Sequence, residues 1–465
     1  MGWVVTGLVL AMLLAALDQT IMAPALPAVA GELGGLDQMP AVVTAYLVAA
    51  TVVMPVYGKL GDRYGRKRTL QVAVVVFVTG AVLCAFAGSM PQLIAFRVVQ
   101  GVGGGGLMIG AQATIGELVS PRERGRFLGY FGAAYVVAAV GGPLIGGFVI
   151  DRASWRWIFA IYPPLGLLAL VLITVTLRLP RPEGRRQPLD VAGALALGAV
   201  VVGVVLTGQT RNPAFAALAA AGVVAWLVSA RYAADPILPL RLFRERAFAV
   251  PVGISLVIGF ALFGTVTYMP AYLQIAQRAS ATRAGLLVTA LMGGVLLSTV
   301  VSGRLITRTG RYKPFPVAGT AVAAVGLGLI GLTAGSPPAL AASMLLAGLG
   351  VGMVMQVMVL AAQNAVSYGD LGTATSAVTF VRQIGASAGV AVVGALITLR
   401  SGISATETPA ALPDGVRAAF ATAVPPVFAA MAPLLAVAFV LALALPARPL
   451  RTTAYADETP VKETS

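Results

Sequence analysis

The chain has 465 residues, of which 58% are hydrophobic and 11% are charged, and its mean hydropathy is +0.90. Soluble domains carry about 25% charged residues, so this composition argues against a soluble enzyme, a disordered chain and a nucleic-acid-binding protein. The formal net charge of +15 could indicate a polyanionic partner. In a membrane protein, however, the same excess arises from basic residues that hold cytoplasmic loops in place.

Two absences limit the chemistry. The chain contains no histidine, which excludes a histidine-based triad, proton relay or metal site and leaves carboxylates as the natural proton carriers. Cys84 is the only cysteine, so no internal disulfide can form, and its apolar neighbours predict a buried small residue. No Walker-type nucleotide motif occurs. We therefore expect no cofactor and no metal.

Fourteen mainly apolar runs are long enough to cross a membrane as helices, which takes about 20 residues each. The runs lie at 3–29, 41–58, 70–88, 93–118, 127–150, 155–178, 189–208, 214–232, 248–275, 284–303, 315–334, 339–367, 373–399 and 425–446. The first run lacks a basic leader and has Asp18 in its middle, so we expect a membrane span there and not a cleaved signal peptide. The sequence thus predicts an all-α integral membrane protein with 14 transmembrane helices.

The distribution of basic residues predicts the orientation of these spans. If both termini are cytoplasmic, the inner loops and the tail hold 23 of the 32 lysines and arginines, and the outer loops hold 7. Such a bias explains the net charge by topology, and a nucleic-acid partner is not needed. Arginine outnumbers lysine by 28 to 4, which is typical of a GC-rich bacterial genome. We expect a multi-pass protein of a bacterial inner or plasma membrane.

An internal repeat indicates the architecture. Residues 58–68 read GKLGDRYGRKR, and 245 residues later residues 303–313 read GRLITRTGRYK. The same offset places the start of the first span on the start of the ninth. Internal repeats are typical of secondary transporters, whose substrate sites lie near the midplane between the repeats. The predicted parts are a first half (1–180), an inserted two-helix segment (181–247), a second half (248–446) and a cytoplasmic tail (447–465).

These residues carry a resemblance to a known family. The loop at 58–68 resembles the hallmark loop of the major facilitator superfamily. Five further matches resemble its fourteen-span drug:H+ antiporters: LDQTI at 17–21 with ALP at 25–27; Arg97, Gln100, Gly101 and Gly103; GP at 142–143 with GG at 146–147; WRWIF at 155–159; and RQIG at 382–385. The resemblance covers essentially the whole chain. It implies the two-halved fold of that superfamily and proton-coupled efflux.

The sequence departs from the family pattern at several positions. Ala23 and Pro24 replace a usual Asn and Val, and Tyr162 replaces a common Asn after the WRW motif. Ala138 stands where Gly is usual, and Thr307 replaces the acidic residue of the second-half loop.

Asp18 and Arg97 are the predicted proton-coupling residues. A carboxylate near the centre of a spanning helix costs about 2.5–3.5 kcal/mol on insertion scales, so it normally faces a cavity or a partner. Asp18 could carry protons or anchor a cationic substrate, and the alternative is a structural ion pair or hydrogen bond. Arg97 is assigned to proton coupling by the resemblance, whereas a purely structural arginine would bond carbonyl groups between helices.

Two motifs indicate segments that take part in a conformational change. The loop residues Gly58, Asp62, Arg63, Gly65 and Arg66, with Glu117 at the end of the fourth span, are interpreted as a charge latch between span ends; plain topology anchoring is the alternative. Gly142, Pro143, Gly146 and Gly147 would bend and thin the fifth span. The family associates this motif with exporters, and ordinary packing is the alternative.

Residues 101–106 match G-x-G-x-x-G, but inside an apolar helix they indicate helix packing and not nucleotide binding.

Polar, aromatic and methionine side chains within the spans are candidates for the substrate site. Amides in a membrane helix usually face protein or water, methionines adapt to varied ligands, and tyrosines offer faces to lipophilic cations. Each residue could equally serve helix packing. The candidate set is Asp18, Gln100, Met108, Tyr268, Tyr272, Met353, Gln356, Gln363, Asn364 and Arg382.

The predicted function is proton-coupled efflux of lipophilic drugs or antibiotics by alternating access, with a monomer in the lipid bilayer and no enzyme activity. A lipid or glycolipid exporter on the same scaffold is the first alternative. An uptake symporter is a second, and the exporter motif counts against it. A receptor that has lost transport is a third, against which Asp18, Arg97 and Asp62 argue.

Overall fold

The computed structural model describes residues 2–35, 38–179, 188–279, 281–333, 335–401, 414–450 and 452. All regular elements in these residues are helices. Fourteen helices or joined helix pairs there are long and apolar enough to cross a membrane. The predicted fold class and the number of spans are confirmed.

The first half consists of α1 (Gly2–Ile21), η1 (Ala23–Ala25), α2 (Leu26–Leu33), α3 (Met39–Tyr64), α4 (Arg66–Ala85), α5 (Met90–Leu118), α6 (Pro121–Arg152), α7 (Arg156–Ala160) and α8 (Tyr162–Thr176). A short 3₁₀ turn separates α1 from α2. Pro24 lies in this turn, where it lacks the backbone N–H that would continue the α-helical ladder.

The inserted segment and the second half follow in the same manner. They comprise α9 (Val191–Thr210), α10 (Pro213–Tyr232), α11 (Leu240–Phe243), α12 (Arg246–Ala276), α13 (Ala281–Thr309), α14 (Pro314–Thr333), α15 (Pro337–Asn364), η3 (Tyr368–Asp370), α16 (Leu371–Ser401), α17 (Asp414–Ala429) and α18 (Met431–Leu443). Several helices extend beyond the predicted runs. For example, α6 begins at Pro121 and not at residue 127, because a proline at the first helical position can precede a charged first turn.

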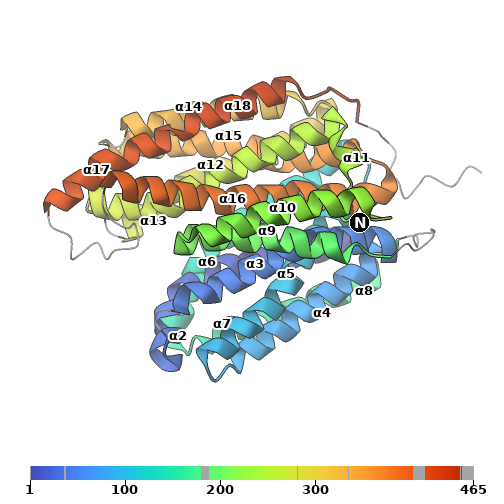
Figure 1. Cartoon of the computed structure of the whole chain (residues 1–465), viewed down its shortest axis with the longest axis horizontal. Coiled ribbons are helices and arrows are strands. Elements are labelled where there is room, and N and C mark those ends of the chain that lie inside the picture. Colours follow the sequence, from blue (N-terminus) through green and yellow to red (C-terminus); the bar gives the residue numbers. More distant parts are fainter. Residues whose placement is uncertain are drawn as a thin grey trace, which may run out of the picture.

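The two halves lie side by side, with the inserted pair across the boundary between them (Figure 1). Two crossings make the most extensive contacts between the halves: α3 packs against α16, and α6 packs against α13. Helix α9 contacts both α3 and α16, whereas α10 packs mainly on α9 and is largely exposed.

The basic loops gather at one end of the bundle, which we call the basic end. Lys59 pairs with Asp235 there, Lys67 donates to the carbonyl of Thr174, and Arg241 pairs with Asp370. These contacts connect loops of both halves and of the inserted segment. Helices α1, α4, α6, α12, α14 and α16 start at this end, and α3, α5, α13 and α15 finish there.

Candidate functional site

Asp18 forms a fully buried ion pair with Arg97 inside the first half. Asp18 lies in α1 and Arg97 in α5, and neither side chain is exposed. Nη1 of Arg97 donates to Oδ2 of Asp18 at 2.6 Å and to Oε1 of Gln100 at 2.9 Å, while Nε2 of Gln100 donates to Oδ1 of Asp18 at 3.0 Å. Because both charges are removed from water, each depends on the other for compensation.

Tyr46 of α3 holds Arg97 in position. The guanidinium carbon of Arg97 lies 4.4 Å from the centroid of the Tyr46 ring, and the hydroxyl of Tyr46 donates to the carbonyl of Ala15 at 3.1 Å. Gly104 makes room for that hydroxyl, since a Cβ at this position would collide with it. The glycine run in α5 therefore packs the helix closely against α3.

Two polar atoms beside the pair are buried without a hydrogen-bond partner among the described residues. They are Nη2 of Arg97 and the hydroxyl of Tyr162, which interacts electrostatically with Asp18. Buried polar groups are normally satisfied. Nη2 of Arg97 therefore has unused hydrogen-bonding capacity beside the pair, and the Tyr162 hydroxyl is already directed at Asp18.

The carboxylate of Asp62 joins the two halves at the basic end. Its Oδ1 accepts from Nη2 of Arg66 at 2.5 Å and from the backbone N of Gly372 at 2.8 Å. Its Oδ2 accepts from the backbone N of Thr373 at 2.8 Å and from the Thr373 hydroxyl at 3.0 Å. Asp62 thus caps the N-terminus of α16 from the other half, where helix N–H groups favour an anion.

Glu117 completes this cluster from the end of α5. Its Oε2 accepts from Nε of Arg66 at 2.8 Å, and its Oε1 accepts from the hydroxyl of Tyr368 in the second half. Gly65, with φ of 91°, forms the tight turn that brings Arg66 back to Asp62. Arg63 takes no part: its Nε and Nη1 have no hydrogen-bond partner among the described residues.

Glycines make both crossings between the halves close. A Cβ on Gly58 of α3 would lie 2.6 Å from the carbonyl O of Gly372 in α16, and a Cβ on Gly125 of α6 would lie 2.9 Å from that of Gly303 in α13. Gly58 and Gly303 are the equivalent positions of the sequence repeat. The two crossings are therefore similar in backbone packing.

The polar contacts of the two crossings differ. At the second crossing Thr307 stands where the first has Asp62, and no carboxylate of a described residue caps a helix there. Instead, Arg122 of α6 donates through Nε to the carbonyl of Thr307 at 3.2 Å and through Nη2 to that of Arg308 at 3.0 Å. A cation here binds the C-terminal carbonyls of α13, the opposite helix end to the one that Asp62 caps.

The 142–147 motif divides into two faces of α6. Gly142 and Gly146 face α1, where a Cβ would collide with the Thr20 hydroxyl or the Ile21 carbonyl, respectively. Pro143 is exposed, and a Cβ on Gly147 would meet nothing within 4 Å. Only two of the four predicted residues therefore shape the contact with α1.

Further polar side chains meet where α5, α15 and α16 adjoin. Nε2 of Gln363 donates to the hydroxyl of Thr375 at 2.8 Å and to the carbonyl of Gln112 at 3.3 Å. The side-chain amide of Gln112 and Oε1 of Gln363 have no partner among the described residues. This amide layer lies next to the Asp62 cluster.

Deeper in the membrane is a second group, the central cluster of Tyr135, Gln356, Thr379 and Arg382. Nη1 of Arg382 donates to the carbonyl of Met355 at 3.4 Å, and Arg382 interacts electrostatically with Tyr135 of α6. Gln356 lies against α6 at Gly132. Its Oε1 and the Thr379 hydroxyl oxygen are buried without a partner among the described residues.

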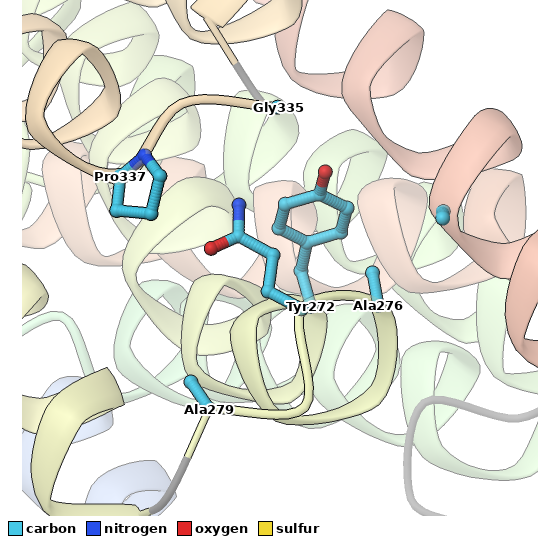
Figure 2. A pocket seen from close by; sticks show the side chains of 7 residues that line it. Tyr272, Ala276, Ala279, Gly335 and Pro337 are labelled. Carbon is cyan, nitrogen blue, oxygen red and sulfur yellow. The ribbon is translucent and has the colours of Figure 1, made fainter.

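The two predicted tyrosines of α12 lie away from the central cluster. The Tyr268 hydroxyl donates to the carbonyl of Val390 on α16 at 2.9 Å, and the Tyr272 ring packs edge-on against Phe428, with centroids 6.2 Å apart. Tyr272 also borders a pocket of about 470 Å³ (Figure 2), near the end of α12 that lies opposite the basic end. This pocket is lined by Tyr272, Ala276, Gln277, Ala279, Gly335, Pro337 and Ala421.

Three other predicted substrate residues face parts of their own half or a helix end. Met108 accepts a weak hydrogen bond from Gln19 at 3.5 Å. Met353 faces α14, where its Cβ would lie 2.9 Å from a Cβ on Gly319, and Asn364 ends α15. No group of three or more His, Cys, Asp or Glu among the described residues could hold a metal ion.

Sequence reasoning missed several partners. Thr373 and Tyr368 meet the Asp62 cluster across more than 240 residues of chain, and nothing in the sequence indicates these pairings. Gln112 could have been found, because it is an amide within an apolar run. Tyr135 carries no such signal.

Two helical halves that meet along a polar interface within fourteen spans define a membrane transporter. Residues 8–390 and 280–463 match the family model described as Major Facilitator Superfamily. The chain belongs to this superfamily. It is a transporter and not an enzyme.

Individual relatives support this assignment. An uncharacterized MFS-type transporter of Mycobacterium tuberculosis is 40% identical over 96% of this chain and 69% of its own length. The multidrug transporter protein MdtP of Bacillus subtilis is 35% identical over 87% of this chain and 76% of its own length. The crystal structure of the human organic anion transporter MFSD10 covers 95% of this chain and 99% of its own, with a TM-score of 0.68 and 17% identity, a likeness of fold.

Proposed function

We propose that the chain exports lipophilic compounds, drugs and antibiotics among them, across a bacterial plasma membrane in exchange for protons. The observation that carries this proposal is the Asp18–Arg97 pair, a carboxylate and a cation sequestered together within the membrane. The 35% identity to a protein named a multidrug transporter gives further support. One chain is the transport unit, and the basic end with both termini faces the cytoplasm.

Transport proceeds by alternating access. The halves 1–180 and 248–446 rock against each other about the site between them, with 181–247 as a connecting segment. The Asp62 cluster supports the role of a latch that holds the halves together at the basic end and breaks when this end opens. Arg66 and Glu117 act in the latch with Asp62, and Gly58 and Gly65 permit its backbone geometry.

Protonation of Asp18 is the coupling event. A proton arriving from outside neutralises the carboxylate and leaves Arg97 beside a neutral acid, which removes the Coulombic attraction between them. Nη2 of Arg97, which has no hydrogen-bond partner among the described residues, is then available for a new hydrogen bond. Release of the proton to the cytoplasm restores the ion pair and resets the carrier.

The change at Asp18 reaches the second half through α6. Thr20, two residues after Asp18, donates to the carbonyl of Ala138 on α6 at 2.8 Å. Gly142 and Gly146 keep α6 in close contact with α1, and Gly125 of the same helix meets α13. A shift of α1 therefore acts on the crossing between α6 and α13.

The proton gradient is sufficient to drive export. One proton moving through 100 mV contributes ~2.3 kcal/mol, and one unit of pH difference adds ~1.4 kcal/mol. Because each ~1.4 kcal/mol supports a tenfold concentration ratio, the two contributions together sustain a substrate gradient of about a few hundredfold.

Substrate-induced proton release in inverted membrane vesicles tests the proposal. Wild type is compared with Asp18→Asn and with Asp151→Asn, which removes an exposed carboxylate of α6, across a panel of lipophilic cations, acids and neutral antibiotics. We expect substrate-dependent proton movement in wild type and Asp151→Asn that is lost in Asp18→Asn. Absence of proton movement with every compound, in folded protein, contradicts proton-coupled drug export and favours a lipid exporter.

A further inference from the structure

We propose that Arg382 binds an anionic group of the transported compound, so that this exporter selects lipophilic compounds that carry a negative charge. The inference rests on the proposed function, because it assumes that substrates occupy the interface between the halves. It assigns a charge preference to that interface.

Arg382 is a buried cation with most of its hydrogen-bonding capacity unused. The residue is 6% exposed and lies eleven residues into α16, within the membrane span. A guanidinium has five N–H donors, yet Arg382 makes one hydrogen bond, at 3.4 Å, to the carbonyl of Met355. It forms no ion pair with any described residue. Arginines buried for structural reasons alone are normally paired or fully hydrogen-bonded.

The described part of the chain supplies no anion of its own at this depth. Between residues 246 and 446 the sequence contains three acidic residues, Asp370, Glu407 and Asp414. Asp370 is held by Arg241 at the basic end, Glu407 lies outside the described residues, and Asp414 begins α17 at the opposite end. Asp18, the mid-membrane acid of the first half, is already paired with Arg97. Of the two mid-membrane arginines, one is neutralised and Arg382 is not.

The neighbours of Arg382 come from both halves and are polar. Thr379 precedes it by almost one turn on the same face of α16, Gln356 lies on α15 next to the carbonyl that Arg382 contacts, and Tyr135 approaches from α6. Oε1 of Gln356 and the Thr379 hydroxyl are buried without a partner in the described part of the chain. Such unsatisfied groups are expected at a site that a ligand completes.

This arrangement disfavours a cationic substrate at the same place. A cation at the central cluster would meet an uncompensated positive charge in a region of low dielectric. The tyrosines that the sequence suggested for binding a lipophilic cation, Tyr268 and Tyr272, bond or pack within the second half. The interface therefore favours an anionic group at Arg382, with an apolar body beside it.

Binding of charge-matched compound pairs tests this inference directly. Equilibrium dialysis with the purified full chain compares aromatic sulfonates, which keep their charge across the working pH range, with the corresponding neutral sulfonamides and cationic trimethylammonium compounds. The panel uses 5-dimethylaminonaphthalene, naphthalene and biphenyl scaffolds. We expect at least one sulfonate to bind tenfold or more tightly than its neutral and cationic counterparts.

Variants at Arg382 separate a binding role from a structural one. Arg382→Gln should remove the sulfonate preference and leave sulfonamide binding within about twofold, whereas Arg382→Lys should retain a preference because it keeps the charge. Arg152→Gln, which removes an exposed arginine near the end of α6, should behave as wild type. Elution of each variant as a single species on size-exclusion chromatography shows that it is folded.

The outcomes are distinct from those of the proton assay. A preference that is absent from wild type or unchanged in Arg382→Gln overturns the inference, as does failure of every sulfonate to bind. An equal loss of all binding in both folded Arg382 variants assigns the residue a structural role and also overturns it. A normal sulfonate preference without proton release would instead refute the proposed proton coupling alone.

Discussion

At the scale of single residues, the Asp18–Arg97 pair shows how a membrane helix accommodates a charge. Each ion is fully buried, and the pair is completed by Gln100 and by the Tyr46 ring. Removing one partner of such a pair leaves the other charge uncompensated, which costs about 3–5 kcal/mol, whereas replacing both can be nearly neutral. The stability of the first half should therefore depend on the two residues jointly.

A double-mutant cycle in detergent measures this dependence. Asp18→Asn and Arg97→Gln should each destabilise the protein by about 3 kcal/mol, and the double variant should cost less than the sum, because it leaves no isolated charge. The control is Glu32→Gln, which breaks the more exposed Glu32–Arg156 pair and should leave the free energy of unfolding close to that of the parent, because exposed ion pairs contribute little. The measurement is the free energy of unfolding by denaturant. If the change in unfolding free energy of the double variant equalled the sum of the two single changes, the two residues would not be coupled.

The sequence predicted the important polar residues of the membrane but not all of their partners. Asp18, Arg97 and Gln100 are conspicuous because polar groups in apolar spans are costly. The sequence alone does not decide whether Arg63 or Arg66 pairs with Glu117, since the pairing depends on the direction in which α4 leaves the Gly65 turn. That direction is determined by tertiary packing and cannot be predicted from the spacing of the basic residues.

At the scale of helices, α6 connects α1, the helix that carries Asp18, with the second half. It contacts α1 through Gly142 and Gly146 and contacts α13 through Gly125. Both contacts require glycine, because the facing atoms leave no room for a side chain. The sequence predicted a thinned span here, but the assignment of each glycine to a face required the structure.

Alanine substitutions distinguish the two faces of α6. Gly146→Ala places a methyl group against the Ile21 carbonyl and should separate α6 from α1, while Gly147→Ala meets nothing within 4 Å. We expect Gly146→Ala to reduce the rate of substrate-dependent proton release about tenfold or more and Gly147→Ala to leave it within about twofold, since overpacking typically costs 1–3 kcal/mol. Equal behaviour of the two variants in the vesicle assay would refute the proposed contact.

At the scale of the whole molecule, the two halves meet at the basic end through two crossings of similar backbone packing and different chemistry. Asp62 caps α16 at one crossing, and Arg122 holds the end of α13 at the other. The repeat predicted the equivalence of α3 and α13, and Thr307 was a departure from the family pattern to which the sequence attached no consequence. The part played by Arg122 could not be predicted, because it comes from outside the repeated motif.

Removal of the Asp62 charge should open the basic end more often. Asp62→Asn weakens the cap on α16 and the pair with Arg66, and charged caps and pairs of this kind contribute about 1–3 kcal/mol. Spin labels at Glu123→Cys and Arg311→Cys, exposed positions on the two halves, report the separation by pulsed electron resonance. We expect a larger long-distance population in Asp62→Asn than in the parent. An unchanged distance distribution would exclude a latch.

The position of α9 has a consequence for molecules dissolved in the bilayer. Because α9 lies against both α3 and α16, it covers one of the two lengthwise seams between the halves, and the seam between α6 and α13 has no such cover from the inserted pair (Figure 1). The protein therefore presents two different sides to the lipid chains: α9 covers the boundary between the halves on one side, and α6 and α13 form the boundary on the other. For a compound that moves sideways out of the bilayer, α9 lies in the way at the seam between α3 and α16 and not at the seam between α6 and α13.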